Sequence, residues 1–208
     1  MTKTNPKYRL LNSAPVPAGQ RTYIVIGLGR SGTSFIASVL DYFGIFLGDK
    51  VRKDNLEDLR LTGPIEANDY AAARDVITDY NARFDIWAYK RPSMLLRATA
   101  TESLFRNPHY IFTHRDFFAL ALRNEISISR EIADSLRKSI EASKHIYALM
   151  ESTSVPCLHL SFELSNADPV KAAGLIRDFA LPDRKREPID KKAFKAFMDA
   201  NLRVYLTQ

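Results

Sequence analysis

One segment near the start of the chain restricts the possible folds more than any other. Residues 22–26 (Thr-Tyr-Ile-Val-Ile) form an apolar, β-branched run, which is typical of a buried strand. A glycine-rich turn, Gly27–Gly32, follows directly, and apolar residues then recur at helical spacing from Thr33 to Phe43. Gly44 suits the left-handed position that ends such a helix. A strand, a glycine loop and a helix in this order indicate an α/β nucleotide-binding fold.

The rest of the chain alternates between predicted strands and helices. Further strands are expected at 85–89, 109–113 and 156–162. Helices are expected at 65–80, 94–105, 116–122, 129–150, 168–179 and 191–203, with a loop at 50–61 and a turn at Gly63-Pro64. The helix at 129–150 carries one apolar stripe that includes Ile140 and Tyr147. No hairpin signal joins two strands, so we expect a three-layer α/β/α fold with a central, mainly parallel sheet. We predict an irregular arm over 1–20 and a single domain over 21–208.

Composition excludes several other classes of protein. The chain has 208 residues, the length of one domain, and its 46% hydrophobic residues exclude a mainly disordered chain. Cys157 is the only cysteine, which excludes an intrachain disulfide and a Cys-based zinc site and favours a reducing, cytoplasmic location. No apolar run reaches the roughly 18 residues of a membrane span, and residues 1–20 lack the apolar stretch of a secretion signal.

The net charge of +6 suggests an anionic ligand, although a mildly basic domain can also carry such a charge without a specific partner. A nucleic-acid surface would need basic residues clustered with aromatic ones, and only Arg184–Arg186 and Lys191–Lys192 cluster. We therefore expect no nucleic-acid partner. Ligands of such sheets bind at the carboxyl ends of the strands, so the residues directly after each strand are the candidates.

The glycine loop matches the dinucleotide fingerprint G-x-G-x-x-G at Gly27, Gly29 and Gly32. Asp49 stands at about the distance of the acidic residue that accompanies this fingerprint. However, that residue should end a second strand, and segment 45–48 is too short and too glycine-bounded to form one. A nicotinamide-dinucleotide domain is therefore disfavoured.

The same loop matches the Walker A pattern only in part, because Thr33 stands where an NTPase has the lysine that contacts the β- and γ-phosphates. A P-loop nucleotide kinase would need Arg30 to replace that lysine. In a third interpretation, backbone amides, hydroxyls and the guanidinium group bind a phosphate-like anion at the start of a helix. The cofactor-binding residues are then Gly29, Arg30, Ser31, Gly32, Thr33 and Ser34.

Residues 23–34, Y-I-V-I-G-L-G-R-S-G-T-S, resemble the 5′-phosphosulfate loop of sulfotransferases that use 3′-phosphoadenosine 5′-phosphosulfate (PAPS). In the carbohydrate and bacterial branches this loop reads G-x-x-R-S-G-T-[ST], with no Walker lysine. The resemblance implies a P-loop NTPase-like fold and PAPS as the co-substrate. It also implies transfer of a sulfuryl group to a hydroxyl of a sugar, lipid or small metabolite, without a metal.

The resemblance implies a second anchor for the donor. In the family, a strand ends in Arg-Asp, and this arginine and a serine eight residues later hold the 3′-phosphate. Arg115 and Asp116 follow the predicted strand 109–113, but Arg123 stands at the place of the serine. A guanidinium there can still bind phosphate in a bidentate manner. Arg115 and Arg123 are therefore candidates for this contact.

The resemblance also implies catalytic residues. Gly63-Pro64-Ile65-Glu66 resembles the family's G-x-[FI]-E element, so Glu66 is the candidate base, and His114 is an alternative. Lys90 resembles the lysine of the family's K-D-P strand end, although Arg91 replaces the aspartate. Arg30 and Lys90 would stabilise charge on the leaving phosphate.

Two further predictions concern metals and other functions. His109, His145 and His159 are far apart in the sequence and form no ligand pattern, so no metal site is expected. A P-loop nucleotide kinase or a non-catalytic nucleotide-binding module remains the alternative, because Arg91 and Arg123 depart from the family pattern.

Overall fold

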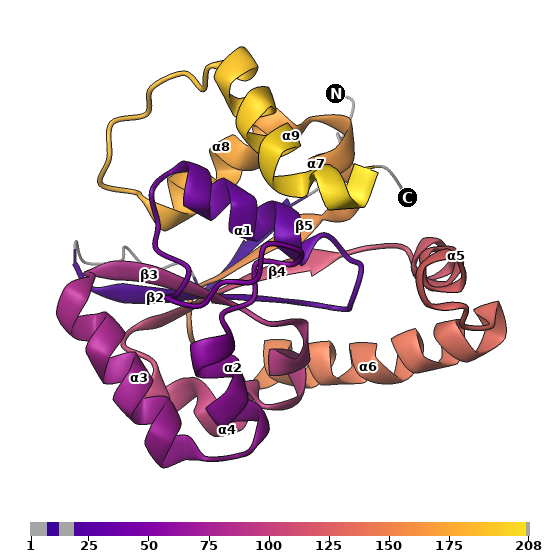
Figure 1. Ribbon diagram of the computed structural model, residues 1–208, viewed down its shortest axis with the longest axis horizontal. Helices are drawn as coiled ribbons and strands as arrows, with labels where there is room; N and C mark the ends of the chain where they lie inside the picture. Colours follow the sequence, from indigo (N-terminus) through magenta and orange to yellow (C-terminus); the bar gives the residue numbers. More distant parts are fainter. Residues whose placement is uncertain (1–7, 13–18, 207–208) are drawn as a thin grey trace.

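A five-stranded sheet forms the centre of the computed structural model, which describes residues 8–12 and 19–206 (Figure 1). The strand order is β1-β5-β4-β2-β3. The strands are β1 (Tyr8–Leu11), β2 (Arg21–Gly27), β3 (Ile86–Lys90), β4 (Pro108–His114) and β5 (Cys157–Ser161). The last four strands are mutually parallel, and β1 pairs with β5 in the antiparallel direction. The expected mainly parallel sheet is confirmed.

Helices cover both faces of this sheet (Figure 1). One layer contains α1 (Thr33–Tyr42), α8 (Pro169–Ala180) and α9 (Lys191–Leu206). The opposite layer contains α2 (Leu59–Glu66), α3 (Tyr70–Arg83), α4 (Ala98–Thr101) and α6 (Ile132–Ser152). The short 3₁₀ helices η1 (Pro92–Leu96) and η2 (Glu102–Leu104) flank α4. The helices α5 (Phe117–Ile128) and α7 (Phe162–Ala167) begin soon after β4 and directly after β5, respectively.

Strand β2 lies at the centre of the core, and all seven of its residues are buried. Tyr23 and Val25 pack into the layer of α1 and α8, whereas Ile24 and Ile26 pack with Trp87 against the opposite helices. This alternation follows from the two-residue period of a strand. A strand with both faces buried places the loop that follows it on a rigid support.

The local signals for helix ends are confirmed. Asp116 caps α5 by accepting a hydrogen bond from the Ala119 amide at 2.8 Å. Asp168 caps α8 in the same way through the Lys171 amide at 3.0 Å. Gly44, just beyond α1, adopts the left-handed conformation with φ +77°.

The prediction of one helix over 65–80 after a turn at Gly63-Pro64 is wrong. Gly63 and Pro64 lie inside α2, which begins after its cap Asp58, and α3 starts separately at Tyr70. The predicted loop over 50–61 is therefore also too long. The Asp58 carboxylate accepts hydrogen bonds from two amides of the first turn and from the Tyr80 hydroxyl, at 2.7 Å in the latter case. These buried contacts stabilise a helix that local propensity disfavours.

Three further expectations need correction. The predicted helix over 94–105 is divided among η1, α4 and η2. Tyr8–Leu11, within the predicted irregular arm, forms the edge strand β1, whereas residues 1–7 and 13–18 of that arm lie outside the described residues. On α6, Ile140 and Tyr147 are 46% and 66% exposed, so the apolar stripe does not face the core as a whole. The buried side of this helix carries Ser135, Ser139, Ser143, Ile146 and Leu149.

Candidate functional site

A cavity of about 700 Å³ lies at the carboxyl ends of the parallel strands. The loop after β2 forms one wall, with Gly29, Arg30 and the start of α1. Lys90 at the end of β3 lines it, as do Arg115 after β4 and Phe162 after β5. Because β2, β3, β4 and β5 are parallel, their carboxyl ends meet at this one edge. The volume is that of a site for a ligand of nucleotide size.

Close packing fixes the loop that follows β2. A Cβ atom on Gly27 would lie 2.6 Å from the Ser31 Oγ and 2.8 Å from the Thr113 side chain. Gly32 has φ +98°, and a Cβ atom there would approach the Phe162 ring to 2.7 Å. The Thr113 hydroxyl also donates a hydrogen bond to the Ser31 carbonyl at 2.7 Å. Both glycines are thus required by close contacts, and the loop is anchored to β4.

The structure brings five of the six predicted loop residues to the cavity. Its lining includes Gly29, Arg30, Gly32, Thr33 and Ser34. Ser31 is different, because its side chain is 1% exposed and its amide donates to the Leu28 carbonyl at 3.1 Å. Ser31 therefore packs inside the loop and does not line the cavity. Arg30 is exposed and has φ +69°, a conformation that is uncommon outside glycine.

Arg115 and Arg123 lie on the wall of the cavity formed by β4 and α5. The Arg115 guanidinium donates to the Arg30 carbonyl at 2.9 Å and lies over the Phe162 ring, 4.2 Å from its centroid. Burial lowers the pKa of Arg115, and the neighbouring charge of Arg123 lowers it further. Two cations held near each other favour a ligand that carries more than one negative charge.

Lys90 is the last residue of β3, which is separated from β4 by β2 in the sheet. Its side chain is 3% exposed, and its ammonium group donates to the Glu57 carboxylate and to the Asn55 carbonyl, both at 2.9 Å. Burial lowers the pKa of Lys90, and the charge of Glu57 opposes that effect. The Ser34 hydroxyl donates to the same Asn55 carbonyl at 3.2 Å. This contact joins α1 to the segment that carries Glu57.

Glu66 belongs to the same cluster through Arg91. The Arg91 guanidinium pairs with both Glu57 and Glu66, and the Ser93 hydroxyl donates to Glu66 at 3.1 Å. Partial burial would raise the pKa of Glu66, but the hydrogen bonds and charge of Arg91 outweigh it and lower the pKa. Glu66 is the last residue of α2, not part of the first turn of a longer helix. Arg91, the departure from the family pattern, thus bridges two carboxylates.

The sequence pattern assigned no specific role to Asn55, Glu57 or Phe162, which all line the cavity. Asn55 and Glu57 lie in a charge-dense, aperiodic stretch, where no pattern marks one acidic residue above the others. Phe162 directly follows β5, so its position at a strand end marks it as a candidate for the lining of the site.

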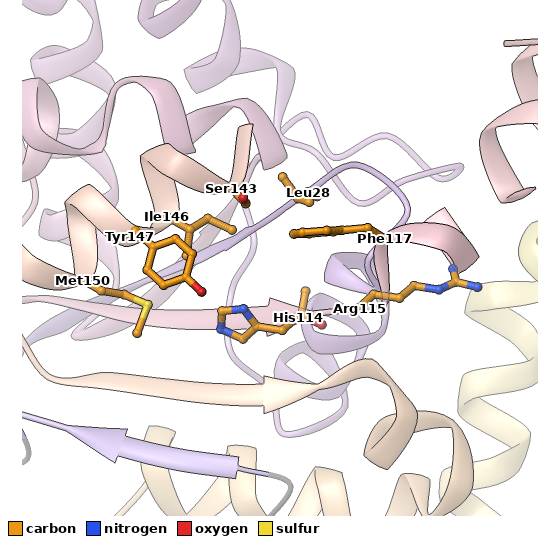
Figure 2. Close-up of a pocket in the computed structure, with 9 residues that line it drawn as sticks. Leu28, His114, Arg115, Phe117, Ser143, Ile146, Tyr147 and Met150 are labelled. Atoms are coloured by element: carbon orange, nitrogen blue, oxygen red, sulfur yellow. The ribbon is translucent and has the colours of Figure 1, made fainter. Parts of the chain in front are cut away.

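His114, the alternative base, does not line this cavity. It lies in a smaller pocket of about 230 Å³ between the end of β4 and α6 (Figure 2). Its Nε2 atom is 2.9 Å from the His159 Nδ1 atom, and burial lowers the pKa of both rings. For His159 the lowered pKa is about 4.

The described residues offer neither a cluster of metal ligands nor a membrane-spanning helix. Nowhere in ranges 8–12 and 19–206 do three or more His, Cys, Asp or Glu side chains gather as metal ligands would. Among the helices that the structure describes, none has both the length and the apolar character needed to cross a bilayer.

The fold is similar to that of sulfotransferase domains of known structure. No protein-family model and no curated protein matches the chain. One solved structure that matches is described as the sulfotransferase domain from the curacin biosynthetic pathway, with a TM-score of 0.53, 12% identity and coverage of 91% of this chain and 79% of that one. Another is the sulfotransferase domain from the Synechococcus PCC 7002 olefin synthase, with a TM-score of 0.57, 16% identity and coverage of 91% and 78%. The chain therefore has the sulfotransferase fold.

Proposed function

We propose that the protein transfers a sulfuryl group from PAPS to a hydroxyl acceptor. The cavity at the carboxyl edge of the sheet is the main support for this proposal. Four of its lining residues, Arg30, Lys90, Arg115 and Arg123, are cationic, against the acidic Asp54 and Glu57. A donor with a 3′-phosphate and a 5′-phosphosulfate carries negative charge at two separate places. The cations of this cavity are likewise divided, because they follow different strands of the sheet.

The glycine loop would hold the 5′-phosphosulfate. Gly32, Thr33 and Ser34 lie at the amino-terminal end of α1, where backbone N–H groups and the helix dipole favour an anion. Arg115 and Arg123 would bind the 3′-phosphate, and the Phe162 ring beside them offers an apolar face to the nucleoside. The absence of a Walker lysine, with Thr33 in its place, favours this donor over ATP.

The reaction we propose is an in-line displacement at sulfur. The acceptor oxygen forms a bond to sulfur while the bond from sulfur to the bridging oxygen of the 5′-phosphate breaks. The acceptor loses its proton, and the bridging oxygen leaves with the electron pair. Arg30 and Lys90 would stabilise the charge that grows on that oxygen. Catalysis by positioning and charge suits a site in which Lys90 is buried and fixed at the end of β3.

Glu66 is our candidate for the proton acceptor. The Glu57 oxygens are each occupied, Oε1 by Lys90 and Oε2 by Arg91. In contrast, the hydrogen bonds to Glu66 from Arg91 and Ser93 all end on Oε1, and its side chain is 38% exposed. Among the described residues, no hydrogen bond occupies the Oε2 atom of Glu66. Because Arg91 lowers its pKa, this carboxylate is ionised at neutral pH and ready to accept a proton.

The donor is tested by thermal shift with adenosine 3′,5′-bisphosphate, ADP, ATP and NAD. Stabilisation by the bisphosphate above the other three supports PAPS use. A response to ATP or NAD without a response to the bisphosphate refutes it. If the bisphosphate stabilises the protein but no labelled sulfate is transferred to any acceptor, the protein is a non-catalytic nucleotide-binding module and the proposed transfer is refuted.

The base is tested by Glu66→Gln, which should lower kcat by about 10²- to 10⁴-fold and leave bisphosphate affinity within about twofold. Glu187→Gln is the matched control, because Glu187 is exposed and its carboxylate lies 3.7 Å from the ammonium group of Lys185. Full activity of the Glu66 variant would remove that residue from the mechanism.

A further inference from the structure

The pocket that contains His114, here called the His114 pocket, is distinct from the donor cavity. Figure 2 shows the His114 ring on one side of it, with Tyr147 and Met150 of α6 nearby and Phe117 toward the other end. Leu28 also lines the pocket, and it directly precedes Gly29 of the donor loop. Its volume is about 230 Å³. An apolar cavity of about 150 Å³ already accommodates benzene in another protein, so this pocket has room for an aromatic ring with a short alkyl chain.

Apolar side chains form most of the His114 pocket. Leu28, Phe117, Ile146 and Met150 supply this surface, and Arg115 is the one formally charged side chain among its described lining residues. Burial lowers the pKa of His114, so this ring adds no charge at neutral pH. A cationic metabolite would lose its hydration in this pocket without gaining a counter-ion.

Most polar groups of the lining are already used within the protein. The Ser143 hydroxyl donates to the Ile140 carbonyl at 2.7 Å, and the Thr113 hydroxyl donates to the Ser31 carbonyl at 2.7 Å. Among the described residues, no hydrogen bond occupies the Tyr147 hydroxyl or the Nδ1 atom of His114. Two such groups suffice for a single alcohol oxygen. They are too few for a sugar, whose several hydroxyls would each lose water.

The histidine pair determines which hydrogen atom His114 presents. The Nε2 atom of His159 is buried and has no hydrogen-bond partner, so a proton there would be unsatisfied. The tautomer assigned from this network carries the His159 proton on Nδ1, which donates to His114 Nε2 at 2.9 Å. His114 then carries its own proton on Nδ1 and can donate it to an oxygen of a ligand.

The His114 pocket adjoins the donor cavity and is connected by packing to the 3₁₀ helix that supports Glu66. Arg115 lines both the pocket and the donor cavity. The helix α6, which supplies four residues of the pocket lining, also packs against η1. This 3₁₀ helix begins next to Arg91, and its Ser93 donates a hydrogen bond to Glu66. A molecule in the pocket thus contacts the donor-site residue Arg115 and the helix α6, which packs against the support of the proposed base.

We propose that the His114 pocket binds the apolar part of the acceptor, and that the acceptor is an aromatic or short aliphatic alcohol and not a sugar. The role of the bound alcohol as an acceptor rests on the proposed sulfuryl transfer. The binding site itself rests on the lining, the volume and the satisfied polar groups.

The test is a ligand-observed NMR titration with 4-propylphenol and with methyl β-glucoside. It is carried out on the full chain with and without adenosine 3′,5′-bisphosphate. Tyr147→Asp places a carboxylate at the pocket, and Tyr147 is 66% exposed, so the variant should fold. Ala148→Asp is the matched control, because it adds the same charge to the next, exposed residue of α6, outside the pocket.

We expect 4-propylphenol to bind and the glucoside to show no saturable signal. Tyr147→Asp should weaken 4-propylphenol by about tenfold, and Ala148→Asp should leave it within about twofold. Tighter binding of the glucoside, or equal effects of the two substitutions, would overturn the inference. Bisphosphate binding is measured separately, and it should not change in either variant. If the unsubstituted protein does not bind the bisphosphate, PAPS use is refuted. The phenol titration still shows independently whether the His114 pocket binds an alcohol.

Discussion

Replacing Glu57 by Gln would leave the buried ammonium group of Lys90 without its counter-ion. The two side chains are 6% and 3% exposed, and their charged atoms lie 2.9 Å apart. Removing one partner of such a buried pair typically costs about 3–5 kcal/mol. Proton release from Lys90 limits this cost. At pH 7, deprotonating a lysine with an unfolded-state pKa of about 10.4 requires about 5 kcal/mol. For a domain of this size we expect Tm to fall by roughly 6–20 °C.

Because deprotonation of Lys90 limits the loss of stability, that loss should depend on pH. In the Gln variant the folded-state pKa of Lys90 is depressed further, so the unfolded chain binds more protons than the folded chain at neutral pH. The variant therefore gains stability as pH rises toward the pKa of free lysine. At pH 9 the cost of deprotonation, and with it the largest possible loss, is only about 2 kcal/mol.

Urea denaturation at pH 7 and pH 9, with the unsubstituted protein measured beside the variant, checks both values. Glu141→Gln is the control, because it breaks an exposed pair with Lys144 and should leave the midpoint unchanged. A loss below about 1 kcal/mol at pH 7 would show that Lys90 does not depend on Glu57. An equal loss at both pH values would refute the argument from proton release.

Three other predictions follow from the site and its supports. Arg115→Ala should weaken adenosine 3′,5′-bisphosphate by roughly 10- to 100-fold in calorimetry, whereas Arg130→Ala, which removes a residue outside the cavity lining, should not change its affinity. Because the pKa of His159 is lowered to about 4, unfolding free energy should fall by roughly 3 kcal/mol as pH drops from 6.5 to 4, and His159→Phe should flatten that part of the profile in urea titrations. Gly32→Ala should cost at least about 1–2 kcal/mol of stability and reduce nucleotide binding, whereas Gly174→Ala, with open space in α8, should stabilise the protein by about 0.5–1 kcal/mol; thermal denaturation compares the two.

The parts of the fold that local chemistry determines were predictable from the sequence. The buried run 22–26 and the glycines after it require a strand and a tight loop, whatever the rest of the chain does. Asp116 and Asp168 cap helices through hydrogen bonds that span three residues. Because ligands of parallel sheets bind at the carboxyl ends of the strands, the position of Arg115 directly after β4 predicts its place in the cavity.

The parts that depend on distant contacts were not predictable. Glu57 is singled out only by Lys90 and Arg91, which lie 33 and 34 positions away. Gly63 and Pro64 look like a turn, and they are helical because the Asp58 cap is also bound by Tyr80, 22 positions away. On α6, Ser135, Ser139 and Ser143 are buried together with Ile146 and Leu149, and this helix packs closely against α5. Periodicity alone cannot distinguish such a seam from a polar surface.

The edge strand β1 has a practical consequence for handling the protein. Tyr8–Leu11 pairs along Cys157–Leu160 and occupies the hydrogen-bonding edge of β5. A truncation that removes β1 would uncover a row of unpaired backbone groups next to Leu158 and Leu160. We expect such a truncated chain to self-associate through this edge. Amino-terminal tags should therefore be placed before residue 8, and deletions should end before it. Light scattering of the truncated and full chains at equal concentration would measure the difference.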